Sequence, residues 1–132
     1  MPESGVGYAG FTNALSHASP YLRVSDVERS LRFYVDELGF REIWRHAPEP
    51  ELPRLLAIAR GGATLVLTEH ADVPFGGLVC LQTSELETVF HELAARGVTL
   101  DLAPTDMPWR MRELHLRDPD GNRVRFCQPV LV

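Results

Sequence analysis

Apolar residues follow two spacings along this chain, one typical of helices and one typical of strands. Segments 26–38 and 85–96 carry apolar residues three and four positions apart, as one buried helical face requires. These are Val27, Leu31 and Tyr34 in the first segment and Leu86, Phe90 and Leu93 in the second. Elsewhere apolar and polar residues alternate, which predicts strands at 19–24, 40–46, 54–60, 63–69, 77–83, 98–102, 111–117 and 122–128.

Both helical segments begin with the same signature, at an offset of about 59 residues. Ser25-Asp26-Val27-Glu28 and Ser84-Glu85-Leu86-Glu87 each fit a capping box, in which the serine and the glutamate accept from free backbone amides. A glycine follows each helix, and Gly61-Gly62 and Asp120-Gly121 mark later turns at the same offset. A duplicated β-α-β-β-β unit explains these matches, so we expect an α+β fold of two tandem modules.

The module boundaries follow from this repeat. We expect an N-terminal flexible arm at 1–16, a first module at 17–70, a linker at 71–76 and a second module at 77–132. Since a module of about 60 residues buries little apolar surface alone, the two should pack as one compact domain.

Composition narrows the class of protein. The net charge of −5 argues against partners such as nucleic acid or an anionic membrane. No run approaches the roughly 20 apolar residues of a membrane span, and Met1 to Ser16 lacks a signal-peptide pattern, so we expect a cytoplasmic protein. Cys80 and Cys127 form no CxxC motif and do not suggest a disulfide framework.

Strand alternation divides the predicted sheets into an apolar face and a mixed face. The apolar face, which should pack on the helices, carries Leu22, Val24, Leu65, Leu67, Val79, Leu81, Val124 and Phe126. The mixed face carries Ser19, Tyr21, Arg23, Thr64, Val66, Thr68, Leu78, Cys80, Gln82, Arg123, Arg125 and Cys127. Apolar walls with a few polar groups suit a small-molecule pocket. A partly wet sheet face or a dimer contact is the alternative interpretation.

The run from Leu22 to Tyr34, with Leu38-Gly39-Phe40 after it, resembles the opening of the vicinal oxygen chelate superfamily, which includes glyoxalase I, extradiol dioxygenases and bleomycin resistance proteins. The closing run Asp118-Pro119-Asp120-Gly121-Asn122 is similar to its last hairpin. The resemblance implies the glyoxalase/bleomycin resistance fold, in which the curled mixed sheets of two modules form a cavity.

Metal-dependent members of that superfamily hold their ion at positions that correspond here to Ser19, Val66, Leu78 and Arg125. A divalent metal needs about three donors with lone pairs, and a guanidinium has none. We therefore expect no metal and no cofactor. A register shifted by two residues would offer His17, Thr68, Cys80 and Cys127 instead, and this alternative stays open.

Pro108-Trp109, Arg112-Glu113-Leu114 and the run from Leu116 to Pro119 are similar to the metal-free bleomycin resistance branch, except that Arg110 replaces the usual glycine. That resemblance implies a homodimer that sequesters a ligand in grooves between its chains, with Trp109 stacked on a flat ligand. Arginines near the cavity do not suit cationic bleomycin, so the ligand stays unnamed. The alternatives are a glyoxalase- or dioxygenase-type enzyme, with a non-standard metal site or metal-free chemistry, and a dimeric scaffold with a vestigial pocket.

The expected ligand-binding residues share the mixed face or the segment after it: Tyr21, Arg23, Thr68, Gln82, Trp109, His115, Arg125 and Cys127. Their arginines would pair with an anionic or polar group, and their aromatic rings would stack. Simpler interpretations stand beside these, with His115 as a surface histidine, Trp44 and Trp109 as cover for a dimer seam, and Tyr21 as core packing.

Overall fold

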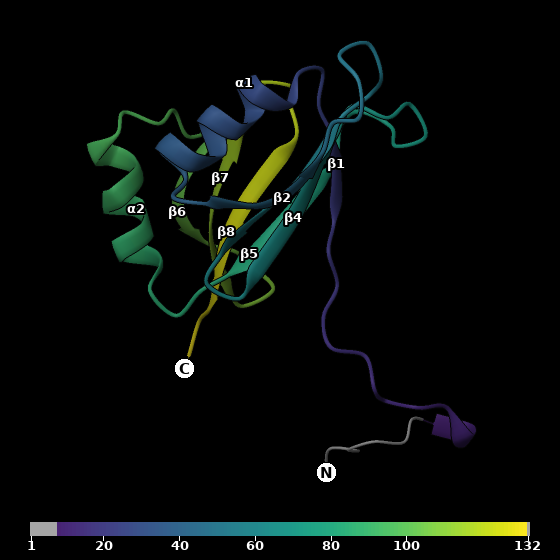
Figure 1. Cartoon of the computed structure of the whole chain (residues 1–132). Helices are drawn as coiled ribbons and strands as arrows, with labels where there is room; N and C mark the ends of the chain where they lie inside the picture. The colour runs from purple at the N-terminus through teal and green to yellow at the C-terminus, as the bar shows by residue number, and fades with distance from the viewer. Residues whose placement is uncertain (1–7, 132) are drawn as a thin grey trace.

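The protein is built around two four-stranded mixed sheets (Figure 1). The computed structural model describes residues 8–131. The first sheet has the order β1-β4-β3-β2, with β1 at Tyr21–Arg23, β2 at Arg41–His46, β3 at Leu55–Arg60 and β4 at Ala63–Thr68. The second has the order β5-β8-β7-β6, with β5 at Leu78–Gln82, β6 at Leu102–Asp106, β7 at Met111–Arg117 and β8 at Arg123–Pro129. The pairs β1–β4 and β5–β8 are parallel and the others antiparallel, which confirms the predicted α+β fold of two tandem β-α-β-β-β modules.

One helix belongs to each module. The first, α1 (Val27–Arg32), continues into a π-helical segment, η2 (Phe33–Glu37), and the second, α2, spans Leu86–Ala95. Val27, Tyr34 and Leu93, all on the predicted apolar stripes, are buried. Periodicity therefore located both helices to within one or two residues.

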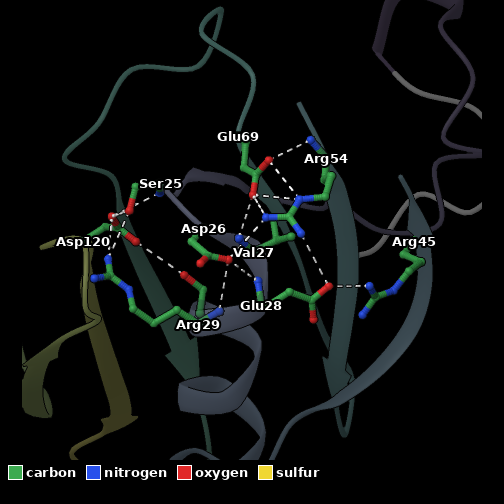
Figure 2. Close-up of polar contacts among 10 residues, drawn as sticks. Ser25, Asp26, Val27, Glu28, Arg29, Arg45, Arg54, Glu69 and Asp120 are labelled. Atoms are coloured by element: carbon green, nitrogen blue, oxygen red, sulfur yellow. Dashed lines mark hydrogen bonds and ion pairs between the residues drawn. The ribbon is translucent and has the colours of Figure 1, made fainter. Parts of the chain in front are cut away.

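The structure corrects the capping box predicted for the first helix (Figure 2). Asp26, not Ser25, is the N-cap, because its carboxylate accepts from the amides of Glu28 (2.9 Å) and Arg29 (3.4 Å). The Ser25 hydroxyl instead donates to Asp120 of the second module at 2.7 Å. A third carboxylate, that of Glu69, accepts from the amide of Val27 at 2.9 Å.

The second capping box is wrong as well. Glu85 is the N-cap residue of α2 and makes no side-chain cap. The Thr83 hydroxyl accepts from the Glu85 amide (3.0 Å), and the Gln128 side chain accepts from the Leu86 amide (2.7 Å). Since acceptors from neighbouring segments satisfy these amides, the helix does not need the local serine and glutamate.

Among the strands, β6 differs most from the sequence prediction. The strand expected at 98–102 lies instead at Leu102–Asp106, so it begins at the last residue of the predicted range. Proline is tolerated on an edge strand or at a β-bulge. Pro104 meets both conditions, because β6 is the edge strand of its sheet and the register shifts between Leu102 and Thr105.

A single hydrophobic core joins the two modules. The eight residues predicted for the apolar face are all buried, and they pack with both helices in one cluster. Polar contacts reinforce the junction: the Tyr34 hydroxyl donates to Asp118 (2.9 Å), and the Asn122 amide donates to the carbonyl of Arg23 (2.9 Å). No helix within residues 8–131 is long and apolar enough to cross a membrane.

The N-terminal segment stands apart from this body. Residues 1–7 of the arm predicted at 1–16 lie outside the described residues, as does Val132. A short 3₁₀ helix, η1 (Tyr8–Gly10), begins the described part, which runs away from the sheets in Figure 1. Phe11 and Leu15 on this segment are exposed.

Candidate functional site

The eight residues predicted to bind ligand fall into two groups, one on each sheet. Tyr21 and Arg23 lie on β1 and Thr68 on β4. The second group is on or beside the second sheet and consists of Gln82, Trp109, His115, Arg125 and Cys127.

In the first group, the Arg23 side chain contacts the linker that follows β4. Its Nη1 donates to the carbonyl of Val73 at 3.2 Å, and its guanidinium lies 4.2 Å from the centre of the Phe75 ring. Thr68 is buried and accepts from the amide of His70 at 3.1 Å, whereas Tyr21 has 52% of its surface exposed. Of these three side chains, Tyr21 is the one most available to a ligand.

A hydrogen-bonded set on the second sheet centres on Glu113. Its carboxylate accepts from Trp109 Nε1 at 2.8 Å, and its other oxygen lies 2.8 Å from His115 Nε2. Glu113 is only 5% exposed, but Trp109 is 57% exposed. The indole is therefore fixed at its nitrogen while its ring surface stays open to solvent.

Glu113 carries a charge at neutral pH. Burial opposes its ionisation, but hydrogen bonds from His115 and Trp109 and the charge of Arg125 outweigh burial and hold the pKa of the carboxyl below its ordinary value. Sequence reasoning left Glu113 out of the predicted site, although its alternation with His115 along the strand could have placed it there.

Arg125 completes the second group. It lies opposite His115 on β7 and opposite Cys80 on β5. Its Nε is buried without a hydrogen-bond partner among the residues that the structure describes, as is Nε of Arg23. An unsatisfied buried donor costs about 1–3 kcal/mol, so an acceptor on a ligand would gain by reaching it.

The two cysteines correct a prediction. Cys80 and Cys127 form a disulfide, with their Cα atoms 6.5 Å apart, on the neighbouring parallel strands β5 and β8. Their place on one face of adjacent strands was the signal for this bond, and the absence of a CxxC motif concealed it. Neither sulfur is a free thiol, so the disulfide also removes two donors from the alternative metal set with His17 and Thr68.

The positions used by metal-dependent relatives do not fit a metal ion here. Val66 and Leu78 are apolar and Arg125 is cationic, so three of the four positions offer no metal donor. Within residues 8–131, no three His, Cys, Asp or Glu side chains gather as a metal site would require. Only the Ser19 hydroxyl remains at these positions, and one oxygen is too few for a divalent cation.

A cavity of about 570 Å³ lies not on the Trp109 surface but between the two modules. Of the eight predicted residues, it is lined by Gln82 alone. Cys80 and Gln82 line this cavity and also belong to the mixed face, so the cavity adjoins that face of the second sheet. The eight predicted residues thus lie on two sheets, and this cavity includes one of them.

The family model for the Glyoxalase/Bleomycin resistance protein/Dioxygenase superfamily matches residues 14–126. The chain belongs to this superfamily, and the two sheets with their covering helices show its fold. No curated protein matches the sequence.

Solved structures show the same fold. TnmS3, an antibiotic binding protein from Streptomyces sp. CB03234, is 33% identical with a TM-score of 0.72, over 88% of this chain and 98% of that one. A superfamily member from Sphaerobacter thermophilus is 28% identical with a TM-score of 0.69, over 86% and 98%. The bleomycin resistance determinant encoded on transposon Tn5 is 23% identical with a TM-score of 0.74, over 89% and 100%, and supports the fold alone.

Proposed function

We propose that this protein binds a small organic, antibiotic-like molecule without a metal ion and sequesters it unchanged. The ligand lies on the mixed face of the second sheet, in a groove that a second copy of the chain completes. The observation that carries the proposal is the exposed Trp109 ring held by the buried Glu113 carboxylate.

The Trp109 ring suits a flat ligand. Because its Nε1 donates to Glu113, the ring keeps its orientation before a ligand arrives, and less entropy is lost on stacking. The unpartnered Nε of Arg125 lies on the same face and offers a donor. A planar ring system that carries a carbonyl, hydroxyl or carboxylate matches both groups.

A second copy of the chain accounts for the large apolar residues that the two mixed faces expose. Tyr21 and Trp44 on the first sheet, and Leu78 and Trp109 beside the second, are each about half exposed. Exposed apolar side chains that lie together on a surface mark interaction sites. If the first sheet of one copy faces the second sheet of the other, Tyr21 and Trp109 line one groove. The antibiotic-binding relative TnmS3 supports a ligand of this class.

Calorimetric titration with a panel of planar aromatic antibiotics tests the proposal. We expect at least one member to bind wild type and to bind Trp109→Ala or Arg125→Ala about tenfold or more weakly. Leu52→Ala, at an exposed loop position, is the control and should bind as wild type does. If no ligand distinguishes wild type from Arg125→Ala, the proposed groove is wrong.

Two further measurements separate sequestration from catalysis. Mass spectrometry of the recovered ligand should show an unchanged molecule, since a modified product would favour a glyoxalase- or dioxygenase-type enzyme. Elemental analysis of protein purified without chelators should find no stoichiometric metal, and a bound ion would contradict the proposal. Sedimentation should give a dimer, which Trp44→Asp should weaken.

A further inference from the structure

The cavity between the modules, which we call the seam cavity, opens into the shared core. The turn from Arg60 to Thr64 and the Phe40 side chain form one wall, and β5 and α2 form the other. Its volume of about 570 Å³ lies within the range of about 300–1,000 Å³ that small-molecule sites occupy.

Within the hydrophobic core cluster, the side chains with residual exposure are those that line this cavity. Five members of the hydrophobic core retain 3–8% exposure, while the remaining members retain 2% or less. The five are Phe40, Val79, Leu81, Val89 and Phe126, and all of them line the seam cavity. The packing of the core is therefore incomplete at one place, where the two modules meet.

The rim of the seam cavity carries no uncompensated charge. Arg60 is the one charged residue that lines it within residues 8–131. Its Nη2 donates to Glu92 at 2.6 Å and its Nη1 to the carbonyl of Leu38 at 2.9 Å. A charged ligand would lose water without gaining a counter-ion, which is costly. Thr64 and Gln82 offer neutral hydrogen-bonding groups at the rim.

We propose that the seam cavity is a second ligand site, separate from the Trp109 groove, for an uncharged and mostly apolar molecule with one polar end. The apolar part replaces the missing core contacts of Val79, Leu81 and Val89. The polar end reaches Thr64 or Gln82. This site lies within one chain and does not depend on the ligand proposed for Trp109.

A matched pair of probes tests both the site and its ligand class. The probes are 2-naphthol, which is neutral at pH 7, and 2-naphthoate, which has the same rings and a negative charge. Because flat rings also suit the Trp109 groove, the titration uses the Trp109→Ala full chain, to which 2-naphthol should bind about tenfold or more tightly than 2-naphthoate.

Variants that fill the cavity locate the binding. Ala63→Phe places a ring in the seam cavity, and Gly62→Phe does so where an added Cβ meets no atom within 4 Å. Both should weaken 2-naphthol binding about tenfold or more. All of these variants, and the matched control Ala103→Phe at an exposed position on β6, are made in the Trp109→Ala chain, which lacks the other ring surface. Ala103→Phe should bind 2-naphthol as the Trp109→Ala parent chain does, with circular dichroism confirming that each variant folds.

Several results would overturn this second site. They are the absence of 2-naphthol binding to the Trp109→Ala chain, equal binding of the two probes to that chain, or unchanged 2-naphthol binding when Ala63→Phe or Gly62→Phe is added to it. Binding that disappears at concentrations where the chain dimerises would also overturn it, because a second copy would then occupy the cavity. None of these results decides whether an antibiotic binds at Trp109.

Discussion

Arg110 has a backbone conformation that suits glycine. Its φ is 66°, in the left-handed region, while its amide donates to the carbonyl of Met107 (3.1 Å) and its carbonyl accepts from Val130 (2.9 Å). A left-handed conformation costs a residue with a Cβ about 1–2 kcal/mol. This conformation would suit the glycine that the resemblance to bleomycin resistance proteins implies after Trp109.

Arg110→Gly should therefore stabilise the protein. We expect the free energy of unfolding to rise by about 0.5–1 kcal/mol, because relief of the left-handed conformation exceeds the entropy cost of glycine. Urea unfolding measures this change. Arg123→Gly, on an extended strand, should lower stability instead. A loss of stability in Arg110→Gly would mean that the arginine side chain contributes more than the turn costs.

The candidate site was predictable in part at single residues. Alternation along the predicted strands placed His115, Arg125 and Cys127 on one face, and the resemblance supplied Trp109. Neither source gave the hydrogen bonds that join Trp109 and His115 to Glu113, since these depend on side-chain conformations and on a chain reversal between Trp109 and β7. The disulfide was missed for a related reason, because strand order had to be known before Cys80 and Cys127 could be placed side by side.

Helices and strands were predictable because their periodicity extends over many residues. The ends of helices were not, because acceptors from distant segments compete there with local serines. At α1 the neighbouring Asp26 accepts from the amide that Ser25 was expected to bind, that of Glu28. The distant Glu69 accepts from the amide of Val27 (2.9 Å) and pairs with the Arg54 guanidinium at 2.7 Å (Figure 2).

Glu69 should make the stability of α1 depend on pH. Burial opposes ionisation of Glu69, but hydrogen bonds from Arg54 and the amide of Val27 outweigh it and hold the pKa of the carboxyl below its ordinary value. A carboxyl with a depressed folded-state pKa stabilises the protein above its unfolded-state pKa, and this stability is lost as pH falls through the folded-state pKa.

We expect Glu69→Gln to lower the free energy of unfolding by about 1–2 kcal/mol at pH 7. The difference from wild type should shrink as pH falls below the ordinary carboxyl range, because wild type then loses the same charge. Guanidinium unfolding at neutral and acidic pH measures it, with Glu49→Gln at an exposed loop position as control. A difference that does not change with pH would show that the shape of Glu69, rather than its charge, stabilises the helix.

The disulfide links the edge strand β5 covalently to its neighbour β8. It closes a loop between residues separated by 47 positions, so Cys80→Ser should lower stability by about 2–4 kcal/mol. Chemical unfolding of oxidised protein measures this loss. Wild type treated with a dithiol reductant should lose a similar amount, and iodoacetamide should label two cysteines only after reduction. Labelling without reductant would contradict the disulfide.

The sequence duplication predicted the overall fold, two modules with a shared core, but not the arrangement of the candidate site or of the seam cavity. Two capping signals, two apolar stripes and two turns at one offset are local features, and together they indicate two modules with a shared core. The orientation of one module against the other depends instead on contacts between residues 84 to 99 positions apart, such as Tyr34 with Asp118 and Arg23 with Asn122. The pattern of apolar and polar residues does not indicate these pairs. The seam cavity, and the placement of the predicted site residues on two sheets, therefore could not be predicted.

Asn122 is the residue on which this orientation most depends. It is fully buried, its Oδ1 accepts from the amide of Gly77 (2.9 Å), and its Nδ2 donates to the carbonyl of Arg23 (2.9 Å) and to Asp118 (2.8 Å). One side chain thus joins β1 of the first module to the residue before β5. The close approach also favours glycine at position 77, where an added Cβ would lie 2.7 Å from Leu22 Cδ2 and 3.2 Å from Asn122 Oδ1.

Asn122→Ala should lower the free energy of unfolding by about 3 kcal/mol, because it removes one buried hydrogen bond to Asp118 and leaves the partly buried Gly77 amide and Arg23 carbonyl without these partners. Asn122→Asp keeps the acceptor for Gly77 but loses the donor to Arg23 and brings a second carboxylate beside Asp118, so it should not restore stability. Hydrogen exchange distinguishes the cause: amides of β1 and β5 should exchange faster in Asn122→Ala, while those of the central strands β3 and β7 stay protected until global unfolding. Uniformly faster exchange would mean that the two modules have no separate junction and that Asn122 stabilises the core as a whole.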